Sequence, residues 1–386
     1  MSGALQQLSS RLRVRRVPAQ RSEPGDLEVL LALPAFSVVR STDRDYVYDR
    51  FAQINQHFKL RFHANHGLRS LALANVQSTI ERFAPRLLPF VNQGSVPALR
   101  VAPGTHVIFS YGDFPIGLKS HVPILWEHTF APQRGIAESA WRQKLRATHL
   151  RAATEATRIV TATDVSVDWF RKVFPELADK ITAIPYYLPH LSVPELSTLE
   201  NKAADSGKLR VVFVGKEARR KGLDSLVAAW ELLDADTRSQ LSFSVISGMY
   251  DGPIELPSEW TLHASVPDVM VSMRDAHVLA FPTKHEAYGL VLVEGLSAGC
   301  AILTTSAEIQ RSIVGPAAGK FVDPTSADQI ATALKQWLSD RATLRANMFA
   351  ARERFAQCYQ PNVVGARYAQ LLWETAGRTV DKVARD

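Results

Sequence analysis

Two segments in the second half of the chain combine residue types that could hold a phosphorylated ligand with free hydroxyl groups. The first, GKEARRKG, runs from Gly215 to Gly222 and places four cations within six residues. The second, HEAYGLVLVEG, places Glu286 eight residues before Glu294. Lysine and arginine make charge-assisted hydrogen bonds to phosphate oxygens, and carboxylates accept hydrogen bonds from neighbouring hydroxyl groups. The basic segment therefore suits a diphosphate, and the glutamates suit a ribose or a hexose.

Each segment lies between an expected strand and an expected helix. The β-branched run LRVVFV at 209–214 precedes the basic segment, and an amphipathic helix is expected over Gly222–Leu233. The run HVLAFP at 277–282 precedes the glutamate segment, and a helix is expected over Leu290–Ala298. Backbone N–H groups at a helix N-terminus attract anions. The alternatives are a solvated basic turn and an exposed glutamate, although the apolar neighbours of Glu294 disfavour an exposed position.

The rest of the second half alternates between strands and helices in the same way. Further strands are expected at 241–246, 261–266 and 301–305, and further helices at 268–274, 327–338 and 341–355. This alternation implies a parallel, doubly wound sheet. In such sheets ligands bind at the carboxyl ends of the strands, which is where both charged segments begin.

The first half shows a second, less regular alternation. Strands are expected at 27–33, 106–110, 123–126, 159–162 and 181–184, and helices at 45–57, 76–87, 143–157 and 166–173. We therefore expect an α/β protein with two Rossmann-like, doubly wound domains facing across a cleft. The expected limits are residues 1–190 for the N-terminal domain, 191–207 for a polar linker and 208–360 for the C-terminal domain.

Composition and motif content exclude several classes of protein. Two cysteines cannot build a disulfide scaffold or a cysteine-based metal site. Neither half has a G-x-G-x-x-G after its first strand, and no Walker A sequence occurs, which argues against a nicotinamide dehydrogenase and a P-loop nucleotidase. His57, His63 and His66 lack the spacing of metal ligands, so no metal site is expected. No uncharged apolar run reaches the length of a membrane span, and the N-terminus lacks the pattern of a secretory signal.

The net charge of +7 lies in the first half of the chain. Residues 1–200 carry 24 Lys and Arg against 17 Asp and Glu, whereas residues 201–386 carry 21 of each. Such asymmetry is typical of a protein with an anionic partner, either nucleic acid, acidic lipid or a phosphorylated substrate. A solvated basic surface is the alternative.

Taken together, the two segments resemble the retaining nucleotide-sugar glycosyltransferases of the GT-B fold, in the group 1 or family four class. The stretch FPTKHEAYGLVLVEGLSAG is similar to the most diagnostic part of that class, and GKEARRKG is similar to its phosphate-binding turn. Residues 208–360 match well, whereas residues 1–190 match only in patches such as VPILWEHTF and ITAIPYY. In this fold the last helix packs back on the first domain, so the same is expected of residues 361–386.

The resemblance assigns a role to each matching residue. It implies that Lys221 contacts the diphosphate, Glu294 holds the ribose and Glu286 lies near the transferred sugar and its phosphate. It places His128, at the end of an N-terminal-domain strand, near the reacting sugar. The implied catalytic residues are His128, Lys221 and Glu286, and the implied residues for binding the sugar donor are Gly215, Lys216, Lys221, Glu286, Tyr288, Gly289, Leu290 and Glu294.

The sequence departs from the family pattern at three places. Lys216 stands where the family usually has arginine, which loses the bidentate fork, and Arg219 or Arg220 could compensate. Many members carry a Gly-Gly loop after the first strand, and this chain has no glycine there. Tyr186 and Tyr187 replace the usual Asn-Gly after ITAIP.

The implied activity is retaining transfer of a sugar from a UDP or GDP sugar to a hydroxyl group of a glycan or lipid-linked acceptor. Synthesis of cell-envelope polysaccharide or glycolipid is the expected setting. No cofactor or metal is required, because lysines stabilise the leaving group, and no nucleic acid partner is expected. The expected location is the cytoplasm, with peripheral contact to an anionic membrane at the inner face as an option. The alternative is a degenerate GT-B scaffold that binds anionic ligands or membranes without catalysis.

Overall fold

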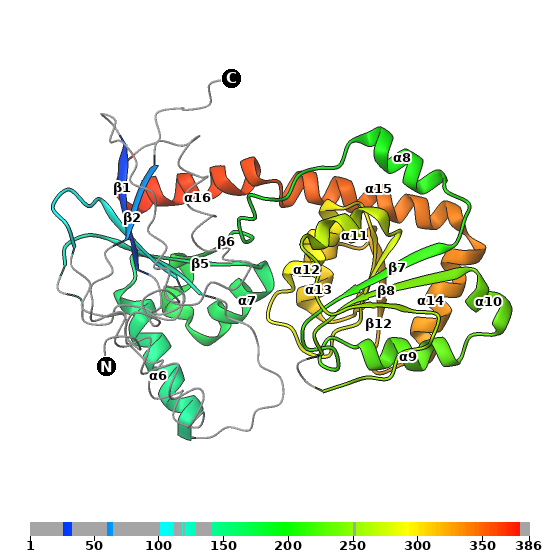
Figure 1. Ribbon diagram of the computed structural model, residues 1–386. Helices are drawn as coiled ribbons and strands as arrows, with labels where there is room; N and C mark the ends of the chain where they lie inside the picture. Colours follow the sequence, from blue (N-terminus) through cyan, green and yellow to red (C-terminus); the bar gives the residue numbers. More distant parts are fainter. Residues whose placement is uncertain are drawn as a thin grey trace, which may run out of the picture. The chain divides into compact units, whose positions relative to one another are not determined.

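The chain forms two compact units, each built around its own hydrophobic core. The computed structural model describes residues 26–32, 60–64, 101–111, 118, 120–128, 140–249 and 252–378. The first unit consists of residues 1–189 and 364–386, and the second of residues 190–363. Each unit contains a sheet with six described strands (Figure 1).

The described strands of the first unit are parallel, in the order β2-β1-β3-β4-β5-β6. They are β1 (Leu27–Ala32), β2 (Leu60–Ala64), β3 (Val107–Tyr111), β4 (Ile124–Glu127), β5 (Arg158–Thr161) and β6 (Ile181–Ala183). The described helices are α6 (Ala140–Glu155), α7 (Asp164–Val173), the 3-10 helix η2 (Pro175–Lys180) and α16 (Pro361–Thr375).

Helices cover both faces of this sheet. Alternate side chains of β1 and β3, such as Val29 and Phe109, pack against α16, the red helix beside β1 in Figure 1. Phe109 meets Tyr368 of α16 edge to face at 6.3 Å between ring centroids. The intervening side chains, among them Leu30 and Trp126, pack against α6 and α7. The burial of both faces explains why these strands are nearly continuous apolar runs.

The second unit repeats this architecture. Its strands are β7 (Leu209–Val214), β8 (Leu241–Ile246), β9 (Thr261–His263), β10 (Val278–Phe281), β11 (Ala301–Thr305) and β12 (Gly319–Val322). Its helices are α8 (Leu196–Ala204), α9 (Leu223–Glu231), α10 (Ala235–Ser239), α11 (Val269–Asp275), α12 (Leu290–Ser297), α13 (Glu308–Val314), α14 (Ala327–Ser339) and α15 (Arg341–Cys358).

In the second sheet the strand order reverses between β7 and β10. The order is β12-β11-β10-β7-β8-β9, with every pair parallel. The chain lays down β7, β8 and β9 toward one edge and then crosses to place β10 on the other side of β7. α9 and α14 pack on one face, and α12 packs on the other, where Gly295 lets it approach Leu279 and Ile302 closely.

The segment 191–207, which was expected to be a linker, contains helix α8. Leu199 is buried in the core of the second unit, and Lys202 Nζ donates hydrogen bonds to the carbonyl oxygens of Ala276 and Ala298 at 3.0 and 2.8 Å. The helix lies between the breakers Pro194 and Gly207, and these contacts hold it against the rest of the second unit. The expected helices at 45–57 and 76–87, and the side chains of His57, His63 and His66, lie outside the described residues.

Candidate functional site

The two charged segments meet at the carboxyl edge of the second sheet. The basic segment begins directly after Val214, the last residue of β7, and the glutamate segment follows Phe281, the last residue of β10. β7 and β10 are neighbouring parallel strands, so the two loops lie side by side. This is the point where the strand order reverses, which is where open α/β sheets bind their ligands.

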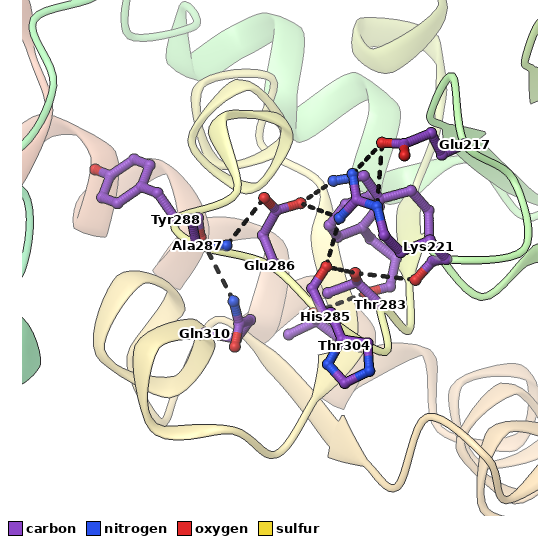
Figure 2. Close-up of polar contacts among 11 residues, drawn as sticks. Glu217, Lys221, Thr283, His285, Glu286, Ala287, Tyr288, Thr304 and Gln310 are labelled. Carbon is purple, nitrogen blue, oxygen red and sulfur yellow. Dashed lines mark hydrogen bonds and ion pairs between the residues drawn. The ribbon is translucent and has the colours of Figure 1, made fainter. Parts of the chain in front are cut away.

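Lys221 and Glu286 form an ion pair between these loops. Lys221 Nζ donates to Glu286 Oε2, and the two side chains point toward one another in Figure 2. Each side chain is only 14% exposed, and Lys221 Nζ also lies 5.2 Å from the ring centroid of Phe281. The second carboxylate oxygen of Glu286 accepts a hydrogen bond from the Ala287 N–H at 3.2 Å. Shielding from solvent strengthens the interaction of this cation with any nearby anion.

Two glycines give the loops their close approach. Gly222 has φ +87°, and a Cβ at this position would lie 2.1 Å from the carbonyl oxygen of Pro282 in the other loop. A Cβ on Gly215 would lie 3.0 Å from Cγ of Lys221. Gly222 therefore brings the loops together, and Gly215 leaves room for the aliphatic part of the Lys221 side chain.

The other cations of the basic segment point to different places. Lys216 is exposed. Arg219 donates to the carbonyl oxygen of Pro253 at 2.8 Å. Arg220 donates through Nη1 to the carbonyl oxygen of His285 at 2.6 Å, and the same nitrogen lies 4.0 Å from Glu286 Oε2. The structure therefore brings Arg220, rather than Arg219, to the Lys221–Glu286 pair.

The glutamate segment turns into α12 at Gly289, whose φ of +102° is in the left-handed region. Tyr288 is buried, and its ring points away from Lys221 in Figure 2. Its carbonyl oxygen lies 3.5 Å from Nε2 of the buried Gln310. Leu290, the first residue of α12, is half-buried. This segment can thus offer a ligand its backbone N–H groups at the start of a helix.

Glu294 lies one turn further along α12 and is 1% exposed. The alternative of an exposed glutamate on the polar side of the helix is therefore wrong. A buried carboxylate is costly unless other groups hydrogen-bond to it.

His128 belongs to the first unit and follows the last residue of β4. Its backbone N–H donates to the carbonyl oxygen of Val160 at 3.0 Å. Its ring lies 5.1 Å from the Trp126 ring and 4.8 Å from the His149 ring, measured between centroids. Burial and the neighbouring His149 lower the pKa of His128 to about 3. The imidazole is therefore neutral at physiological pH.

Three residues of the site were not expected from the sequence. Glu217 makes an ion pair with Arg220, and the spacing of three residues could have indicated this contact. The Thr283 hydroxyl lies 3.4 Å from the carbonyl oxygen of Arg220 and 3.2 Å from that of His285. Gln310 reaches Tyr288 from α13, and no local pattern indicates this contact.

The described residues contain neither a membrane-spanning helix nor a cluster suited to a metal ion. None of the described helices combines the length and apolar character of a membrane span. Within the same part of the chain, no cluster of three or more His, Cys, Asp or Glu side chains is arranged to hold a metal ion.

One family of known proteins matches a large part of the second unit. Residues 197–354 match the family described as glycosyl transferases group 1. The matched region runs from α8 into α15 and includes both loops of the site. The second unit therefore carries the group 1 glycosyltransferase pattern. None of the curated proteins matches this chain.

Several solved structures share the fold over most of the chain. Sucrose-phosphate synthase from Thermosynechococcus elongatus is 14% identical with a TM-score of 0.59, and the alignment covers 90% of this chain and 98% of that structure. WaaG, a glycosyltransferase involved in lipopolysaccharide biosynthesis, is 16% identical with a TM-score of 0.57 and coverages of 90% and 99%. HepE from Anabaena, in complex with UDP-glucose, is 12% identical with a TM-score of 0.57 and coverages of 90% and 100%. The expected fold class, GT-B with two Rossmann-like domains, is confirmed.

Proposed function

We propose that the protein transfers a sugar from a nucleoside-diphosphate sugar, with UDP or GDP as the nucleotide, to a hydroxyl acceptor. The observation that carries this proposal is the Lys221–Glu286 pair at the strand-order reversal of a unit that matches group 1 glycosyltransferases. The lysine can bind the diphosphate, and the carboxylate beside it can bind hydroxyl groups of the sugar. The complex of HepE with UDP-glucose supports UDP as the first nucleotide to test.

The remaining residues of the two loops have roles in holding the sugar donor. Glu294 accepts hydrogen bonds from the ribose hydroxyl groups. The backbone at Tyr288, Gly289 and Leu290 presents N–H groups to the diphosphate and the sugar at the start of α12. Lys216, exposed beside the loop, adds positive charge that attracts the anionic ligand.

The charges define the chemistry of the transfer. Cleavage of the bond between sugar C1 and the phosphate oxygen leaves an oxocarbenium-like sugar and a nucleoside diphosphate. Lys221 stabilises the negative charge that develops on the leaving group. The acceptor oxygen forms the new bond to C1 on the face that the phosphate leaves, and the leaving phosphate oxygen takes the acceptor proton. The configuration at C1 is retained, and the lysine supplies the electrostatic stabilisation, so this proposal includes no metal or other cofactor.

The first unit binds the acceptor in this proposal. Neutral His128 hydrogen-bonds a hydroxyl group of the transferred sugar. The excess positive charge of residues 1–200 favours an anionic, lipid-linked or phosphorylated acceptor at the cytoplasmic membrane face. The role of WaaG in lipopolysaccharide biosynthesis supports a cell-envelope product of this kind.

The first experiment measures the melting temperature with UDP, GDP and ADP, each alone. The variants are wild type, Glu294→Gln, and Glu259→Gln as a control at an exposed position. A ligand at 100 times its Kd stabilises the folded protein by roughly 2.7 kcal/mol. We expect one nucleotide to stabilise wild type and Glu259→Gln but not Glu294→Gln. Release of that nucleotide from its sugar derivatives then tests sugar transfer. NMR of the product shows which anomer forms and so tests retention of configuration at C1.

A non-catalytic binding module is the second candidate, and the charge asymmetry favours it. In that case no nucleotide changes the melting temperature. The protein then sediments with phosphatidylcholine vesicles that contain phosphatidylglycerol, but not with phosphatidylcholine alone, and salt weakens the binding. Equal sedimentation with both vesicles removes the support for an anionic acceptor as well as for this module.

A further inference from the structure

Arg220 joins the two loops of the site through its backbone and its side chain. Its carbonyl oxygen accepts a hydrogen bond from the Lys284 N–H at 2.9 Å. Its Nη1 donates to the His285 carbonyl oxygen at 2.6 Å. Its Nε and Nη2 both donate to Glu217 Oε2. The guanidinium is thus held in one orientation beside the Lys221–Glu286 pair.

The neighbouring Arg219 gives an internal comparison. Its guanidinium donates to the Pro253 carbonyl oxygen at 2.8 Å, and Arg219 as a whole is exposed. Arg220, by contrast, has a side chain that is 34% exposed and a nitrogen 4.0 Å from Glu286 Oε2. Two adjacent residues of the same type therefore differ in whether they can act on Glu286.

When a diphosphate binds, the single ammonium group of Lys221 lies near two anions, the Glu286 carboxylate and the diphosphate. In the structure it pairs with Glu286, whose side chain is 14% exposed. A diphosphate carries more negative charge than a carboxylate and draws Lys221 to itself. Glu286 would then lose its ion-pair partner in a shielded place, where an uncompensated charge is costly. The nearest other cation in the described part of this loop pair is Arg220, on the same carboxylate oxygen.

We propose that Arg220 is a positioning residue: it replaces Lys221 as the ion-pair partner of Glu286 when Lys221 binds the diphosphate. The inference rests on the proposed function, because it requires a diphosphate ligand. In this arrangement Glu217 and the His285 carbonyl hold the guanidinium, and a further N–H of Nη1 reaches Glu286 after a shift of about 1 Å, from 4.0 Å to hydrogen-bond distance. Glu286 keeps its place beside the sugar while the lysine acts on the phosphate.

The planar guanidinium is essential to this role. Three N–H groups are engaged by Glu217 and His285, and others remain for Glu286. A lysine has one nitrogen at the end of a flexible chain and cannot hold these partners in fixed directions at the same time. Arg220→Lys should therefore act like a partial loss of the residue, although it keeps the charge.

The test is a double-mutant cycle on nucleotide affinity, measured by calorimetry with whichever of UDP, GDP and ADP stabilises wild type. The four proteins are wild type, Arg220→Gln, Glu286→Gln and the double variant. We expect Arg220→Gln to raise the Kd about tenfold in the wild-type background, which corresponds to about 1.4 kcal/mol. In the Glu286→Gln background, where no carboxylate needs a partner, we expect a change of less than about twofold.

Arg219→Gln is the matched control and should change the Kd less than about twofold in either background. Melting temperatures without nucleotide identify any variant that fails to fold, and Arg220→Lys should then give an intermediate Kd. A loss of affinity that is equally large in both backgrounds overturns the inference, because Arg220 would then act on the phosphate or on loop shape. Unchanged affinity in both backgrounds also overturns it. If wild type binds none of the three nucleotides, the proposed function itself fails.

Discussion

At the scale of single residues, Glu286 competes with a bound diphosphate for the positive charge of Lys221. Glu286→Gln frees Lys221 and removes a negative charge beside the proposed phosphate position. We expect this variant to bind UDP about three- to tenfold more tightly than wild type, a gain of up to about 1.4 kcal/mol. Sugar transfer should fall by about 100-fold or more, because the carboxylate no longer orients the sugar. Calorimetry with UDP and release of UDP from UDP-glucose measure the two effects.

Glu259→Gln, which neutralises an exposed glutamate of the same unit, is the control for the change of net charge and should alter neither quantity. If Glu286→Gln binds UDP more weakly than wild type, Glu286 contacts the nucleotide directly and does not compete with it.

Lys221 and Lys216 differ in burial, and this difference predicts unequal roles. Lys221→Gln removes a shielded charge at the diphosphate position, and a hydrogen bond to a charged group contributes about 1.5–3 kcal/mol. We expect UDP affinity to fall about 10- to 150-fold, with uridine affinity unchanged because uridine lacks the diphosphate. Lys216→Gln, at an exposed position, should lower UDP affinity only a few fold. Equal losses for the two variants would show that the basic loop acts as a diffuse charge.

The sequence could predict the individual charged groups of the site but not their pairing. The basic turn and the two glutamates were evident from residue type and spacing, and Glu294 proved to be buried as its apolar neighbours indicated. Whether Arg219 or Arg220 faces Glu286 depends on the direction in which the chain leaves β7. That direction is set by tertiary contacts such as the Arg220 carbonyl with the Lys284 N–H, which join residues 64 positions apart and leave no local pattern.

At the scale of the elements, Gly222 sets the distance between the two loops. Gly222→Ala would place a Cβ 2.1 Å from the Pro282 carbonyl oxygen and force a left-handed φ of +87° on alanine. We expect a loss of more than about 4 kcal/mol in the free energy of unfolding, because backbone must move. Gly252→Ala is the control, since φ is +108° but the nearest atom is Arg219 Nε at 3.9 Å. Its cost should be the backbone strain alone, about 1–3 kcal/mol.

Urea unfolding of the two glycine variants measures both costs. Similar losses for both would mean that the loops can separate without penalty, and the close contact would then not be needed to assemble the site.

Strands of the second unit followed local pattern, whereas α8 did not. The expected bounds of β7, β8 and β11 agree with the structure. β7 and β11 are almost entirely buried, and β8 alternates between apolar residues and serines in its first four positions. The α8 segment carries a single fully buried leucine, Leu199, and a lysine that ends on two carbonyl oxygens. One buried side chain gives no helical periodicity, so only the folded unit shows why the segment is a helix.

At the scale of the whole molecule, each unit contains a histidine that is neutral at physiological pH. In the second unit, His277 Nδ1 accepts the Arg210 N–H at 3.1 Å, and its Nε2 lies 3.1 Å from the Lys202 carbonyl oxygen. Burial and the nearby Arg210 lower the pKa of His277 from 6.5 to about 4. In the first unit, burial and His149 lower the pKa of His128 to about 3. In both units the folded protein therefore leaves this histidine unprotonated at pH values at which the unfolded chain would protonate it.

This difference predicts how stability depends on pH. Between pH 6.5 and about 4 the unfolded state holds a proton on His277 that the folded state lacks, so the free energy of unfolding decreases as the pH falls through this range. Thermal unfolding of wild type and His277→Gln at pH 7.5 and pH 4.5 measures this pH dependence. His263→Gln, on the exposed strand β9, is the control. We expect His277→Gln to lower the melting temperature at pH 7.5. We also expect the decrease in melting temperature between pH 7.5 and pH 4.5 to be smaller than in wild type by at least about 3 °C, since 1 kcal/mol shifts Tm by about 2–4 °C in a domain of this size. An identical decrease in wild type and His277→Gln would place the proton uptake elsewhere. His128→Gln then becomes the next variant, because the pKa of His128 is also strongly lowered.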